Sequence, residues 1–108
     1  MDFTKEAKND GTLYKWSNVT ESDTPLTTEV PSGKYTVNVE GSYGADTSIE
    51  VKYGLLAGNE ATVQDNELVF TANGSKNIEM AGGFILPVRT GSNSATINIS
   101  LIPILRYP

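Results

Sequence analysis

The side chains that could perform chemistry in this chain are thirteen acidic residues, several hydroxyl residues, and five tyrosines with one tryptophan. The sequence contains no histidine, which removes the commonest general base and the commonest transition-metal ligand together. Ser42, within Gly41-Ser42-Tyr43-Gly44, lacks the spacing of a nucleophile elbow. An acyl-transfer triad is therefore not expected. There is no cysteine either, so the fold has no disulfide framework.

Glycoside hydrolysis would need a pair of carboxylates, one of them with a raised pKa. Glu79 is the nearest candidate, because it lies between the apolar residues Ile78 and Met80. In a strand those two neighbours point to the opposite face, so we expect Glu79 to be a solvated edge residue. The sequence therefore predicts no catalytic residue, no cofactor and no enzymatic activity.

Two short segments, residues 21–24 and 65–67, carry several of the oxygen ligands that calcium prefers. Neither segment matches a known calcium-loop spacing, so no metal site is expected. The net charge is −5, and the eight basic residues are scattered along the chain. Nucleic-acid binding is therefore not expected. No apolar run approaches the ~20 residues of a membrane helix, and the charged N-terminal segment does not resemble a signal peptide.

The aromatic residues Tyr14, Trp16, Tyr35, Tyr43 and Tyr53 could form a platform on which sugar rings stack. Packing in the core and at its rim is the alternative, and the commoner, role of aromatic residues in a small β-protein. Tyr43 lies at the tip of a predicted hairpin. It is therefore the aromatic residue that we most expect to be exposed and to contact a partner.

We expect β-strands to position these side chains, because apolar and polar residues alternate in residues 35–40 and again in residues 48–53. A hairpin that pairs Val39 with Ile49 sets every apolar residue of its two strands against another, and leaves a three-residue loop at 43–45. A shift of one residue would turn all of them to the wrong face. The apolar positions are Tyr35, Val37, Val39, Ile49, Val51 and Tyr53.

A second hairpin is predicted from residues 84–88 and 97–101, with Val88 paired with Ile97. Its buried positions would be Phe84, Leu86, Val88, Ile97, Ile99 and Leu101.

Residues 12–19 are predicted to form the first strand, with Tyr14 and Trp16 on one face and Val19 on the other. Residues 77–81 are expected to cross to the opposite sheet. If they folded straight back at Asn73-Gly74, the buried faces of the two strands would not match.

Seven or eight short strands without helical periodicity indicate an all-β fold, an antiparallel β-sandwich of jelly-roll or Greek-key type. We assign residues 12–104 to this domain, 1–11 to a flexible N-terminal arm and 105–108 to a C-terminal tail. The arm could instead order on a neighbouring subunit, with Phe3 as its anchor. The apolar chain end at 102–108 contains Pro103 and Pro108, which are expected to prevent regular pairing. It would pack back over its own domain or cover a neighbour.

Three segments resemble small virion proteins of tailed bacteriophages: the run VPSGKYTV at 30–37, EGSYG at 40–44 and IEVKYG at 49–54. The likeness continues through residues 84–88 and 95–101, and so spans about Thr12–Leu101. This resemblance implies a compact β-sandwich that sits on the head or in the tail apparatus. It also implies assembly as a trimer, often on the capsid lattice, and a structural role with no catalytic site.

We therefore expect a non-enzymatic virion structural protein, most simply a capsid decoration or head-stabilising protein that acts by burying subunit interfaces. It would assemble in the host cytoplasm, with the major capsid protein or other virion proteins as partners. The alternative is a carbohydrate- or host-surface-binding module of a tail or fibre that uses Tyr43, Trp16 and the loop at 20–33. The predicted interface residues are Phe3, Trp16, Tyr43, Ile104, Leu105 and Tyr107.

Overall fold

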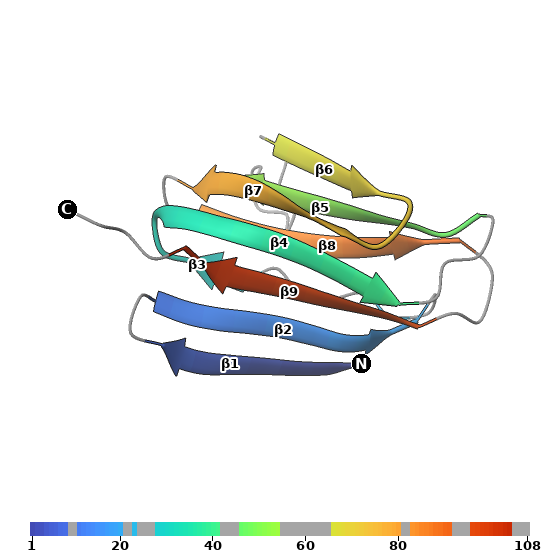
Figure 1. The fold of residues 1–108 in the computed structure, drawn as a ribbon, viewed down its shortest axis with the longest axis horizontal. Coiled ribbons are helices and arrows are strands. Elements are labelled where there is room, and N and C mark those ends of the chain that lie inside the picture. Colours follow the sequence, from blue (N-terminus) through green and yellow to red (C-terminus); the bar gives the residue numbers. More distant parts are fainter. Residues whose placement is uncertain are drawn as a thin grey trace, which may run out of the picture.

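Two antiparallel β-sheets face each other in the computed structural model, which describes residues 1–8, 11–20, 23, 28–41, 46–54, 66–80, 83–91 and 96–104 (Figure 1). The five-stranded sheet has the order β1-β2-β9-β4-β7, and the four-stranded sheet has the order β3-β8-β5-β6. The strands are β1 (Asp2–Lys8), β2 (Gly11–Val19), β3 (Thr28–Val30), β4 (Gly33–Gly41), β5 (Ser48–Gly54), β6 (Asn66–Phe70), β7 (Gly74–Met80), β8 (Gly83–Thr90) and β9 (Ile97–Pro103).

The strand order of β2–β9 is that of a jelly roll. The chain passes from one sheet to the other at every connection from β2 to β9 except the one between β5 and β6. The two sheets that result, β2-β9-β4-β7 and β3-β8-β5-β6, each consist of four strands that interleave distant parts of the chain. The predicted antiparallel β-sandwich is confirmed, and β1 is an additional strand at one edge.

The predicted hairpin between residues 35–40 and 48–53 is wrong, because β4 and β5 lie in different sheets. β4 pairs with β7 and β9, whereas β5 pairs with β6 and β8. Five of the six predicted apolar positions nevertheless lie in the core: Tyr35, Val37, Val39, Ile49 and Val51. The sixth, Tyr53, is half-buried and packs against the core. Alternation determines which face of a strand is buried. It does not distinguish a neighbour in the same sheet from one in the facing sheet.

The second predicted hairpin is also wrong, and one of its strands is turned over. β8 belongs to the four-stranded sheet, and β9 lies in the five-stranded sheet with its predicted face buried. The inward residues of β8 are Ile85, Pro87 and Arg89, which are buried opposite Tyr53, Val51 and Ile49 of β5. Phe84, Leu86 and Val88 therefore lie on the outer face of the sheet and are half-buried. Both faces of β8 are apolar, so its pattern could not identify the inner one.

The crossing between the sheets after Phe70 is confirmed. β6 is in the four-stranded sheet and β7 is in the five-stranded sheet, with a bend at residues 71–73 between them. Glu79 is exposed on β7, an edge strand, as predicted. The sugar-stacking platform is not supported, because Tyr14, Trp16 and Tyr35 are all buried in the core.

A β-bulge in β2 corrects the predicted placement of Val19. The register against β9 shifts between Trp16 and Val19, and Asn18 has a φ of 57°. Asparagine is one of the few residues that adopt this left-handed conformation readily. The shift brings Val19 onto the same buried face as Trp16, where alternation alone had set it on the opposite face.

Both ends of the described chain continue the five-stranded sheet. Residues 2–8 form β1, which pairs with β2 from Asp2 opposite Ser17 to Lys8 opposite Gly11. Within the segment 1–11 that was predicted to be a flexible arm, residues 2–8 are therefore a strand of the sheet. β9 extends to Pro103, which lies opposite Tyr35 on β4, so Pro103 does not end the pairing. One residue further, the Ile104 N–H donates to the Lys34 carbonyl oxygen at 2.9 Å.

Candidate functional site

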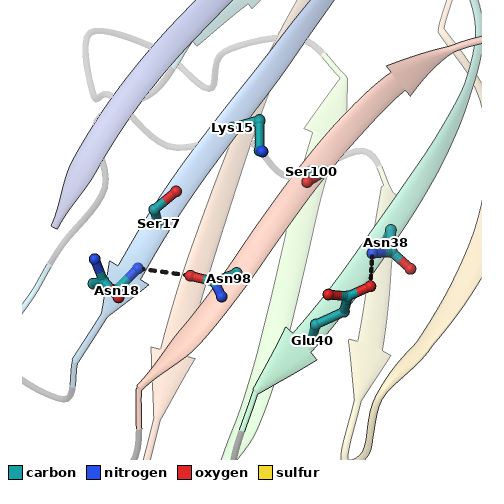
Figure 2. A pocket seen from close by; sticks show the side chains of 7 residues that line it. All are labelled: Lys15, Ser17, Asn18, Asn38, Glu40, Asn98 and Ser100. Carbon is teal, nitrogen blue, oxygen red and sulfur yellow. Dashed lines mark hydrogen bonds between the residues drawn. The ribbon is translucent and has the colours of Figure 1, made fainter.

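A shallow polar groove of about 200 Å³ crosses the outer face of the five-stranded sheet (Figure 2). Three adjacent strands form it, with β9 in the middle and β2 and β4 on either side. Its lining consists only of polar side chains: Lys15, Ser17 and Asn18 from β2, Asn98 and Ser100 from β9, and Asn38 and Glu40 from β4.

The groove follows from the register of the three strands. Ser100 lies opposite Lys15 on one side and Asn38 on the other, while Asn98 lies opposite Glu40. The short side chain of Ser100 between two longer ones leaves a hollow along the middle strand. Because the core face of each strand is apolar, every second residue points outward, and here all of those residues are polar.

Hydrogen bonds hold two walls of the groove in place. Ser75 Oγ donates to Asn38 Oδ1 at 2.6 Å, and Asn38 Nδ2 donates to Glu40 Oε1 at 3.1 Å. The Asn18 backbone N–H donates to Asn98 Oδ1 at 2.9 Å, which joins residues 80 positions apart in the sequence. Asn98 therefore presents its NH₂ group, and Glu40 its second carboxylate oxygen, to a ligand.

Lys15 and Glu40 lie on opposite sides of the groove, with β9 between them (Figure 2). Within the described residues, no salt bridge joins Lys15 or Glu40 to another side chain. Amide, hydroxyl, ammonium and carboxylate groups together supply both hydrogen-bond donors and acceptors. The groove is suited to binding a neutral polyhydroxylated molecule.

The second candidate surface is the outer face of the four-stranded sheet. Phe84, Leu86 and Val88, which we call the β8 stripe, are half-buried there in a row along one strand. Val69 on the nearby strand β6 is 44% exposed on the same face. The β5 residues between them on this face include Glu50 and Lys52.

The third surface is β1, whose residues are all exposed. β1 lies at the lower edge of the sheet in Figure 1, and no described strand of the other sheet lies behind it. Phe3 is 40% exposed, and its ring covers Trp16 with the ring centroids 5.2 Å apart. Lys5 Nζ lies 6.0 Å from the centre of the Tyr14 ring. β1 therefore protects an end of the core that the four-stranded sheet does not reach.

The predicted interface residues differ in their exposure to solvent. Phe3 is exposed and Ile104 is half-buried, whereas Trp16 has 1% of its surface exposed and lies in the core. The prediction that Trp16 contacts a partner or a sugar is therefore wrong. Tyr43, Leu105 and Tyr107 lie outside the described residues.

Asp23, from the segment at 21–24 that carries possible calcium ligands, stabilises a turn by accepting hydrogen bonds from Thr20. Its Oδ2 accepts hydrogen bonds from the Thr20 N–H at 2.8 Å and the Thr20 hydroxyl at 3.0 Å. The hydrogen bond from the Thr20 backbone is the main reason that the pKa of Asp23 is lowered. No group of three or more acidic residues in the described ranges is placed to hold a metal ion.

The sequence interpretation missed both the groove and the β8 stripe. The groove had a signal, since the outward positions of residues 15–17, 38–40 and 98–100 are all polar. Which of these segments are neighbours depends on the strand order, and alternation does not give it. The β8 stripe had a signal too, because residues 84–88 form an unbroken apolar run.

In the described part of the chain, no helix is long and apolar enough to cross a membrane. Comparisons with protein-family models, with curated proteins and with solved structures gave no match to this chain. The likeness to phage virion proteins therefore rests on the sequence pattern alone.

Proposed function

We propose that the protein is a non-enzymatic structural subunit of a phage virion that assembles by burying the outer face of its four-stranded sheet. The observation that carries this proposal is that β8 is apolar on both faces, with Ile85 and Pro87 inward and the β8 stripe outward. The strands of a two-layer sandwich normally present polar side chains to water. A strand that is apolar on both sides is expected to be covered by a third layer.

A subunit interface would supply that layer. Burial of apolar surface contributes about 25 cal/mol per Å², from which the costs of association and side-chain ordering must be subtracted. The jelly-roll topology is found in capsid proteins and also in lectins, so the fold permits this role without deciding it. The proposed partners are the major capsid protein or other virion proteins, and other copies of this chain.

Leu86→Ser should weaken binding to phage heads at least tenfold while the free energy of unfolding falls by only about 1 kcal/mol. The reason is that Leu86 lies at the centre of the β8 stripe and contributes little to the core. Co-sedimentation with shells of the major capsid protein from the same phage measures binding, and urea denaturation measures stability.

The matched control is Ile102→Ser, which removes an apolar side chain with 39% exposure from the other sheet. This variant should bind shells as the unmodified protein does. Equal binding by Leu86→Ser and the unmodified protein would contradict the proposed face.

Carbohydrate binding is a second candidate function, favoured by the polar groove. Sugar hydroxyls donate and accept hydrogen bonds, which matches the mixture of groups that Lys15, Asn98 and Glu40 present. This site differs from the one expected from the sequence, which relied on Trp16. A virion protein could carry both surfaces, because they lie on the outer faces of different sheets.

If the groove binds a glycan, Asn98→Ala should weaken that binding about tenfold, because one hydrogen bond to the ligand is lost. Trp16 is buried, so calorimetry or NMR titration is the suitable measurement, after a glycan array has identified a ligand. Asn77→Ala is the control, since Asn77 lies on the same sheet at β7, outside the groove. An unmodified protein that binds no glycan on the array or at millimolar concentration would rule out this second function.

A further inference from the structure

We infer that the outer face of the four-stranded sheet packs on the same face of a second copy, about a two-fold axis that crosses β5 between Glu50 and Lys52. This inference rests on the proposed assembly role and specifies the partner of that face. The evidence is the arrangement of charged and apolar side chains across β8, β5 and β6.

The strand register places these side chains in two adjacent rows. Glu50 lies opposite Val88 on β8 and Val69 on β6, and Lys52 lies opposite Leu86 on β8 and Glu67 on β6. Glu50 and Lys52 are two residues apart on one strand, so they point to the same face with opposite charges. Both are half-buried.

A two-fold axis that lies in the interface and runs perpendicular to the strands exchanges the two rows. Glu50 of one copy then faces Lys52 of the second copy, and Lys52 faces Glu50, so two opposite-charge pairs form. On β8 the same operation sets Leu86 against Val88 and Val88 against Leu86. On β5 charged residues face opposite charges and on β8 apolar residues face apolar ones, whereas on β6, at the edge of the sheet, Val69 faces Glu67 of the second copy. The central two strands therefore have the self-complementarity that a two-fold interface requires.

Other arrangements of two copies fit less well. A two-fold axis parallel to the strands would set Glu50 against Glu50 and Lys52 against Lys52, and both contacts are repulsive. Pairing through the β1 edge is opposed by Lys5, a charged residue on the core-facing side of an edge strand, which is a common guard against edge-to-edge association. The outer face of the five-stranded sheet has a polar groove at its centre.

The size of the face sets the expected affinity. The strands β3, β8, β5 and β6 contain three, eight, seven and five residues. With about 3.3 Å per residue and about 4.8 Å between strands, the face measures roughly 360 Å² per copy. This is smaller than the interfaces of stable complexes, so we expect a weak dimer that dissociates in the upper micromolar range. The proposed assembly is a dimer with two-fold symmetry, whereas the resemblance to phage proteins implied a trimer.

Two charge-reversal variants test the axis. Glu50→Lys carries two positive charges at positions 50 and 52, and Lys52→Glu carries two negative ones, so each variant alone should weaken dimerisation at least about tenfold. An equimolar mixture should form a heterodimer, because the positive pair of one chain then faces the negative pair of the other. Sedimentation equilibrium and native mass spectrometry measure both states. Glu79→Lys, on β7 of the other sheet, is the control and should dimerise normally.

The absence of cysteine permits a second measurement that does not depend on charge reversal. In a mixture of Glu50→Cys and Lys52→Cys, a short bismaleimide that spans the ~10 Å between facing sheets should link unlike chains more than like ones. Failure of the charge variants to form heterodimers, or equal linking of like and unlike chains, would overturn this axis. A monomeric unmodified protein at 1 mM would overturn the homodimer. Binding of the unmodified protein to phage heads judges the proposed function separately: a monomer that binds heads would overturn the homodimer alone, and a dimer that does not bind heads would overturn the virion role alone.

Discussion

Gly83→Ala should lower the free energy of unfolding by about 3 kcal/mol, from backbone strain and a steric clash together. Gly83 has a φ of 120°, which side-chain-bearing residues rarely adopt. A Cβ added there would lie 2.5 Å from the Gly54 carbonyl oxygen and 3.1 Å from its carbonyl carbon. Because both are backbone atoms of the neighbouring strand, no side-chain rotation could relieve the contact. Urea denaturation followed by circular dichroism measures the change.

The effect should be large because Gly83 lies at a junction of three strands. It begins β8, lies opposite Val30 of β3, and is close to Gly54 at the end of β5. Moving it would disturb the pairing on both sides of β8.

Gly74→Ala is the matched control, since it makes the same substitution at the start of another strand. A Cβ at Gly74 would have no atom within 4 Å, and the φ of Gly74 is not positive. We expect its stability to stay the same or rise by up to about 1 kcal/mol, because alanine restricts the unfolded chain. If the two alanine variants were equally stable, the close approach of β8 to β5 at Gly83 would be refuted.

Alternation of apolar and polar residues determines which face of a strand is buried, but not which strand lies beside it. It identified the buried residues of β4, β5 and β9, because burial of one face is a property of each strand by itself. It gave wrong partners for all three. The core residues of β4 and β5 belong to one apolar cluster between the two sheets, so a pattern that fits a hairpin also fits two strands in different sheets.

Three features lay beyond any local pattern. β8 has apolar residues on both faces, and only its place between β3 and β5 determines that Arg89, not Val88, points inward. The groove depends on contacts such as that between Asn18 and Asn98, which are 80 positions apart. Residues 2–8 form a strand although all are exposed, because the pairing with β2 and the contact of Phe3 with Trp16 are tertiary interactions.

Trp16→Ala should lower the free energy of unfolding by about 3–5 kcal/mol, the range found when a large buried aromatic residue is truncated. Trp16 has 1% of its surface exposed and is among the largest fully buried side chains in the described core. It lies opposite Ile99 of the central strand β9 and under the ring of Phe3. The substitution would open a cavity where β1, β2 and β9 meet, and chemical denaturation would measure the loss.

Phe3→Ala separates the contribution of β1 from that of the core. Phe3 is 40% exposed, so its removal should cost only about 1 kcal/mol, but it should uncover Trp16. Trp16 fluorescence should therefore shift to longer wavelength and become more sensitive to acrylamide quenching in the folded protein. The free energy of unfolding lost in the double variant should be smaller than the sum of the two single losses by about 0.5–1.5 kcal/mol, the usual coupling of an aromatic pair.

A mobile arm at residues 1–11 predicts the opposite: Phe3→Ala would change neither the stability of the protein nor the fluorescence of Trp16. That result would return β1 to the role of a free arm and leave the Trp16 end of the core without its cover.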